Sequence, residues 1–346
     1  MRSHLNIMSD LSMKQERLYF IDFMRVMAVL SIFVYHYTMT VQQYGYTPHF
    51  DRLIGESATF GVSFFIIISG VVLKRGNKNF NLYSFYKKRA KAIYPSFWVA
   101  YAAFSIYAFV KYNAISLHPE ISSIITTISG FDGWTIWMGP NSYLVGEWFI
   151  GFILLIYLIC PVFIIYSDRF PILCLLSSLS ISSLSYYFNS EFSSVVPFMN
   201  PNPMWNPTTR LFEFVTGIIL INKIVVDKKH VREFFVISCV VVSIYVFSGI
   251  KISNSFECIP LFISVFILMS LAYEKIRTDA MCKFFGGLSI YTFMVFLTHH
   301  RMLYELSSTN TLNLHGVFQF VFGLVACMLL CLAISHFLNK VVSKLK

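Results

Sequence analysis

The stretch RVMAVLSIFVYH, residues 25–36, decides how this chain folds, because an apolar run holds an arginine at one end and a histidine at the other. It lies in an apolar segment, about residues 20–41, that is long enough to cross a bilayer as a helix. In a helix, the eleven steps from Arg25 to His36 make three turns plus about 20°, so both side chains share one face, about 16 Å apart along the axis. Asp22 lies one turn before Arg25 on nearly the same face.

The composition around this segment is that of a membrane protein. Of 346 residues, 56% are hydrophobic and only 13% are charged, whereas soluble domains average about 25% charged residues. We expect an all-α, polytopic integral membrane protein with one domain, 1–346, a cytoplasmic tail at 1–18 and no fused soluble domain. The seven cysteines show no metal-ligand spacing, so we expect buried apolar side chains and no metal site.

Ten segments have the length and apolar character of membrane spans. They are about 20–41, 58–74, 93–112, 148–166, 170–188, 209–226, 233–250, 257–273, 284–302 and 315–338. With the N-terminus inside, the cytoplasmic segments carry 21 of the 27 Lys and Arg residues and the outer segments carry four. This asymmetry predicts that both termini are cytoplasmic. It also explains the net charge of +10 by contact with anionic membrane lipids, without nucleic acid.

Ionisable residues inside a span are costly and usually face a cavity or a partner. One interpretation is that Asp22 pairs with Arg25 near the inner surface and that His36 bonds a neighbouring helix. The other is that these three residues form a polar stripe on the first helix that belongs to a functional site.

Six segments in order resemble the acyltransferase-3 family of integral membrane O-acyltransferases. The first helix of that family carries an arginine, ten residues and then a histidine, which here are Arg25 and His36. The other five matching segments are FGVSFFIIISG (60–70), KKRAKAIYPSFW (87–98), WFIGFILLIYLICP (148–161), RLFEFVTGIIL (210–220) and TFMVFLTH (292–299). Two positions depart from the family pattern: Ala92 replaces a basic residue and Ile153 replaces a glutamate.

The resemblance implies transfer of an acyl group, often acetyl, from cytoplasmic acetyl-CoA to a sugar hydroxyl of a surface or lipid-linked polysaccharide such as O-antigen or capsule. It also implies a bacterial inner membrane. Basic side chains in the cytoplasmic loop suit the CoA phosphates. The expected donor-binding residues are Arg25, Lys88, Arg89 and Lys91, and the expected acceptor-binding residues are Glu147, Arg210, Glu213 and His299.

His36 is the expected catalytic residue, together with Arg25. Acyl transfer to a hydroxyl needs a base, and the pKa of histidine suits this task near neutral pH. A covalent acyl-histidine relay is equally consistent with the sequence.

Three other functions are compatible with a membrane protein of this kind. A glycan-lipid transporter or flippase would also place charges in a cavity, but would need no CoA site. A glycan polymerase would favour a long outer loop with carboxylates, and residues 113–147 hold only Glu120, Asp132 and Glu147. A scaffold gives no reason for the stripe on the first helix.

Overall fold

The computed structural model describes residues 17–43, 57–76, 80–113, 121–139, 145, 148–250, 252–308 and 316–345, and these residues form helices and no strand. The α-helices are α2 (Tyr19–Gln43), α4 (Ser57–Gly76), α5 (Leu82–Tyr112), α6 (Ile121–Ser129), α7 (Trp148–Tyr166), α8 (Pro171–Tyr187), α9 (Asn189–Val195), α10 (Leu211–Thr216), α11 (Val231–Phe247), α12 (Ile259–Ile276), α13 (Asp279–Ser289), α14 (Thr292–Ser308) and α15 (Val317–Leu345). A π-helix, η2 (Gly217–Val226), follows α10, and η1 (Pro203–Trp205) and η3 (Phe256–Cys258) are 3₁₀ turns. The all-α prediction is confirmed.

Six of these helices are long and apolar enough to cross a membrane, or up to nine if each bent pair is one span. The bent pairs are α8 with α9, α10–η2 with α11, and α13 with α14. The second pair bends by 120° and covers two segments that the sequence predicts as separate spans, 209–226 and 233–250. The count of ten therefore stays a prediction, while the multi-pass membrane character is supported.

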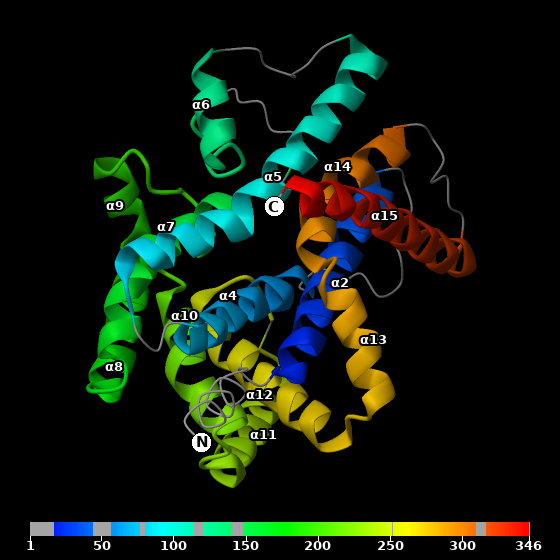
Figure 1. The fold of residues 1–346 in the computed structure, drawn as a ribbon. Helices are drawn as coiled ribbons and strands as arrows, with labels where there is room; N and C mark the ends of the chain where they lie inside the picture. The colour runs from blue at the N-terminus through cyan, green and yellow to red at the C-terminus, as the bar shows by residue number, and fades with distance from the viewer. Residues whose placement is uncertain are drawn as a thin grey trace, which may run out of the picture.

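Helix α2 lies in the middle of the bundle, with α4 beside it and α13 and α14 along its other side (Figure 1). Its 25 residues span about 37 Å, more than the hydrocarbon thickness of about 30 Å. Because neighbours pack on several sides of it, about half of α2 is buried, and Arg25 and His36 line cavities inside the protein.

The contact between α4 and the α10–η2 segment is unusually close because two glycines meet there. A Cβ atom on Gly70 would overlap the Phe214 carbonyl oxygen, and one on Gly217 would overlap the Ile67 carbonyl oxygen. Small residues allow such backbone approach between membrane helices, where van der Waals packing replaces the hydrophobic effect as the driving force. This crossing holds the C-terminal end of α10 and the start of η2 against α4.

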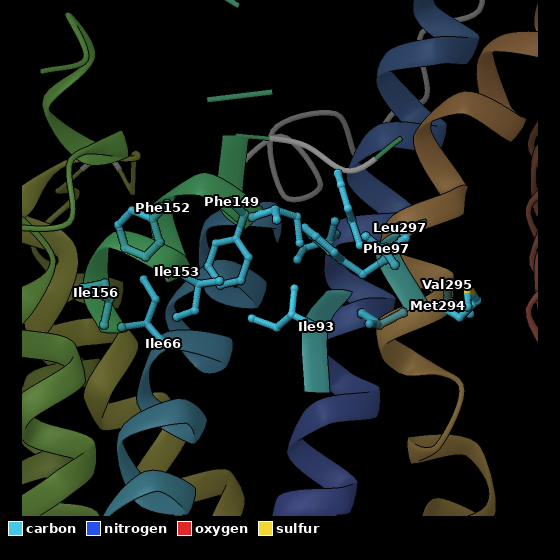
Figure 2. Close-up of a cluster of buried hydrophobic side chains, with 14 of the residues drawn as sticks. Ile66, Ile93, Phe97, Phe149, Phe152, Ile153, Ile156, Met294, Val295 and Leu297 are labelled. Atoms are coloured by element: carbon cyan, nitrogen blue, oxygen red, sulfur yellow. The ribbon is translucent and has the colours of Figure 1, made fainter. Parts of the chain in front are cut away.

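Apolar side chains from α4, α5, α7 and α14 fill the space beside α2 (Figure 2). Phe149 and Phe152 of α7 stack there with ring centroids 5.5 Å apart, next to Ile66 of α4 and Ile93 of α5. Six of the seven cysteines are also buried and all are free, in agreement with their prediction as small apolar side chains.

A polar contact fastens the segment after α6, which lies outside the candidate spans, to α5. Tyr101 donates a hydrogen bond to the Asp132 carboxylate at 2.9 Å. Asp132 is 1% exposed, and burial raises its pKa to about 6.

Candidate active site

Three cavities follow one another along α2, and residues of α2 and α4 line all three. We call them proximal, central and distal, counted from the N-terminal end of α2. Their volumes are about 400, 250 and 420 Å³. The proximal and central cavities share Arg25, Val72 and Ser289, and the central and distal cavities share Phe149 and Phe296. The shared walls show that the cavities are neighbours in series, and Arg25 and His36 lie at different stages of the series.

The proximal cavity surrounds the carboxylate of Asp22, which is buried. Arg17 donates to one oxygen at 2.7 Å, Ser289 donates to the other at 2.7 Å, and Nη1 of Arg25 lies 4.0 Å from that second oxygen. The hydrogen bond from Arg17, which precedes α2, holds the pKa of that guanidinium above its ordinary value. The Asp22–Arg25 pairing suggested by the sequence is thus present but long, because Arg17 holds the closer position.

Two guanidinium groups line the central cavity, Arg25 from α2 and Arg89 from α5. Arg89 lies over the ring of Tyr157, 6.0 Å from its centroid, and its Nε has no hydrogen-bond partner among the described residues. Two cations beside one small cavity favour an anionic or strongly dipolar ligand. The rest of the lining is largely apolar and comes from α4, α7 and α14.

His36 lines the distal cavity and lies against two further histidines. Its ring centroid is 5.1 Å from that of His299 and 5.1 Å from that of His300. His299 is buried, and its Nδ1 lies 2.8 Å from the Phe296 carbonyl oxygen. A carbonyl oxygen only accepts hydrogen bonds, so this contact assigns the Nδ1 proton and orients the ring. The structure therefore brings together the histidines that end two motifs more than 260 residues apart in the sequence.

Arg210 also lines the distal cavity, and its side chain is held by a buried ion pair. Its Nε and Nη2 donate to the two carboxylate oxygens of Glu213 at 2.7 and 3.0 Å, and Nη2 also donates to Ser63 Oγ at 2.6 Å. Ser63 in turn donates to Glu213 at 2.8 Å. Glu213 is 0% exposed and lines none of the three cavities. It lies beneath Arg210 and positions it.

Two tryptophans form one wall of the distal cavity. The indoles of Trp148 and Trp205 stack with ring centroids 5.0 Å apart and an angle of 4° between their planes. Asn254 and Thr59 add an amide and a hydroxyl to the same lining. In the sequence, Trp148 belongs to the motif at 148–161, but no motif includes Trp205. The one indication of Trp205 is that a tryptophan lies in the polar, proline-rich segment 200–207.

The remaining predicted site residues lie elsewhere. Lys88 and Lys91 are exposed and line none of the three cavities, whereas Arg89 between them points inward. Successive helical residues are rotated by about 100°, so these neighbours cannot face one cavity together. Glu147 lies outside the residues that the structure describes.

A family model described as an acyltransferase domain, Acyl_transf_3, matches residues 18–336, nearly the whole chain. The chain belongs to this acyltransferase family. Comparisons with curated proteins and with solved structures give no match. The family match and the apolar helices together make the protein a membrane acyltransferase.

For this acyltransferase, the series of cavities brings together residues from several of the sequence motifs. Every acyl transfer brings a donor, an acceptor and a proton-accepting group to one point. The distal cavity offers His36 with polar groups and aromatic rings around it, and the central cavity offers the cations Arg25 and Arg89. Arg25 lies about 16 Å from His36 along α2, a distance set by the helical rise. The two cavities thus differ in chemistry: guanidinium groups line the central one, and histidine, tryptophan and amide side chains line the distal one.

Proposed function

We propose that the protein transfers acetyl from cytoplasmic acetyl-CoA to a sugar hydroxyl of a surface or lipid-linked polysaccharide, in the inner membrane of a bacterium. The observation that carries the proposal is the series of cavities along α2 that leads from Arg25 toward His36. The Lys and Arg distribution of the sequence predicts that the Arg25 end faces the cytoplasm, where CoA is found, and this prediction supports the proposal.

The donor enters at the proximal end. Arg25 and Arg89 line the central cavity and attract the phosphate groups and amide carbonyls of CoA. Lys88 and Lys91, which are exposed at the same end of α5, add long-range attraction for the anionic nucleotide. The extended pantetheine arm is on the order of the 16 Å between Arg25 and His36 along the helix. The thioester therefore approaches the distal cavity while the nucleotide stays outside the bundle.

The acceptor binds in the distal cavity. The flat faces of Trp148 and Trp205 suit the C–H face of a sugar ring, because the negative face of an indole attracts weakly positive hydrogens. Arg210 and Asn254 supply hydrogen-bond donors for sugar hydroxyls. His299 lines none of the three cavities, but its ring lies against that of His36 and supports the orientation of His36.

In the reaction, His36 accepts the proton of the sugar hydroxyl as the oxygen attacks the thioester carbonyl carbon. The C–S bond then breaks, the CoA sulfur takes the proton back from His36, and the acetyl ester remains on the sugar. A relay in which acetyl rests on His36 before reaching the sugar uses the same residues.

Sided membrane vesicles test this proposal. Inverted vesicles expose the cytoplasmic face, so radiolabelled acetyl-CoA added outside should label the glycan through an alkali-labile ester. Right-side-out vesicles should not incorporate label, and His36→Ala should lower incorporation by about 100-fold or more. Absence of ester from wild-type inverted vesicles, together with glycan-lipid movement across the membrane, would contradict the proposal in favour of a flippase.

A further inference from the structure

Three phenylalanine rings stand where the central and distal cavities meet. Phe65 of α4, Phe149 of α7 and Phe296 of α14 contact one another pairwise, with ring centroids 5.6 to 6.2 Å apart. Phe149 and Phe296 line both cavities, and Phe65 lines the central one. We name these three residues the phenylalanine cluster.

The phenylalanine cluster lies between the two cations and the histidines. Arg25 and Arg89 line the cavity on one side of it, and His36 and His300 line the cavity on the other. The ring of Phe296 is 5.9 Å from that of His299, which in turn contacts His36. Any group that moves from the cations to the histidines inside the protein must therefore pass these rings.

We propose that the phenylalanine cluster selects the acyl group by size, admitting a two-carbon acyl group to His36 and excluding longer ones. This inference rests on the proposed acyl-CoA donor. Phe149 and Phe296 are buried and packed against each other, so the rings open only by leaving that packing. The opening must widen with each methylene of the acyl chain. In a close-fitting apolar passage one methylene changes a rate by roughly 10- to 200-fold.

The neighbouring ring of Phe152 supplies a matched control. It stacks on Phe149 at 5.5 Å and is also buried, but it lines neither cavity (Figure 2). A substitution there disturbs the packing of α7 without widening the passage.

The first experiment measures transfer from acetyl-, propanoyl-, butanoyl- and hexanoyl-CoA by wild type, Phe65→Ala, Phe149→Ala, Phe296→Ala and Phe152→Leu. We expect wild type to prefer acetyl over butanoyl by at least about tenfold. At least one variant of the phenylalanine cluster should raise the butanoyl-to-acetyl ratio of kcat/KM by about tenfold, and Phe152→Leu should leave it within about threefold. Folded, active cluster variants with the wild-type ratio would overturn the inference.

A second experiment reports on the passage without acyl chemistry. Val62 lines the distal cavity, so Val62→Cys places a thiol beyond the rings. A membrane-impermeant methanethiosulfonate reagent, applied from the Arg25 face of inverted vesicles, should modify this cysteine at least about tenfold faster when Phe296→Ala is also present. The protein without Val62→Cys gives the background from the native cysteines.

The two experiments separate failure of the inference from failure of the proposed function. If wild type uses no acyl-CoA while Phe296→Ala speeds cysteine modification, the proposed donor is wrong and the acyl-size selection is refuted with it. The rings would still be a barrier between the two cavities. If wild type transfers acetyl but the acyl ratio does not change in any cluster variant, the proposed function stands and the size selection is refuted.

Discussion

The buried Arg210–Glu213 pair allows the structural and functional roles of one charged residue to be separated. Both side chains are at most 1% exposed, and their closest N–O distance is 2.7 Å. At an effective dielectric constant of about 20, unit charges at that distance attract by about 6 kcal/mol, and desolvation offsets part of this. Removing one partner of such a pair usually costs about 3–5 kcal/mol, because an unpaired charge stays buried.

We therefore expect Glu213→Gln to lower the free energy of unfolding by about 3–5 kcal/mol. The double variant Arg210→Met, Glu213→Leu leaves no buried charge, so its stability should return to within about 1 kcal/mol of wild type. Its transfer activity should stay low, because Arg210 also lines the distal cavity. Unfolding of the purified protein by SDS in mixed micelles, followed by tryptophan fluorescence, measures the stability, and ester formation in inverted vesicles measures the activity.

Two results would refute this reasoning. Wild-type stability of Glu213→Gln would show that the pair does not hold α10 against α4. Full activity of the stable double variant would show that Arg210 has a structural role only and does not bind the acceptor. Ser63 can turn its hydroxyl to a carbonyl of its own helix in the double variant, so it should add little to either measurement.

Three further predictions concern other parts of the molecule. Burial raises the pKa of Asp132 to about 6, above its unfolded value, so the folded state binds the proton more tightly. The free energy of unfolding should therefore fall by about 2–3 kcal/mol as the pH rises from about 4 to 6. Asp132→Asn should abolish this pH dependence in an unfolding titration. Gly217→Ala should push η2 away from α4 and lower the yield of folded protein in detergent, whereas Gly287→Ala, where a Cβ meets no atom within 4 Å, should not. Trp205→Ala should raise KM for the glycan at least about tenfold and leave KM for acetyl-CoA unchanged, and an effect on the donor alone would contradict the acceptor site.

The sequence predicted the features that follow from helical periodicity. Arg25 and His36 share the inward face of α2, and the apolar runs appear as helices. Helix α5 begins eleven residues before its predicted span at 93, because Asn81 caps it and accepts a hydrogen bond from the Ser84 amide. Its first eleven residues include four Lys and Arg residues, so a hydropathy criterion for membrane spans does not detect them.

Features that depend on tertiary contact were beyond sequence reasoning. The meeting of His36 with His299 joins α2 to α14, and no periodicity links segments so far apart. The same holds for the stacking of Trp148 on Trp205, which brings the start of α7 to η1. The bend of 53° between α13 and α14 divides the predicted span 284–302. Apolar composition could not predict this bend, because it indicates burial in lipid and carries no information on the direction of the helix axis.

The claim that the polar face of α2 is the path of acyl transfer is tested most directly in cells. The measurement is the ester-linked acetyl content of the surface polysaccharide with wild type, His36→Ala, Arg25→Ala and His336→Ala, at matched levels of protein in the membrane. His336 of α15 is a suitable control because it bonds Tyr291, the residue before α14, and lines none of the three cavities. We predict that acetyl is present with wild type and His336→Ala and is lost with His36→Ala and Arg25→Ala. Wild-type acetylation by His36→Ala would contradict the account.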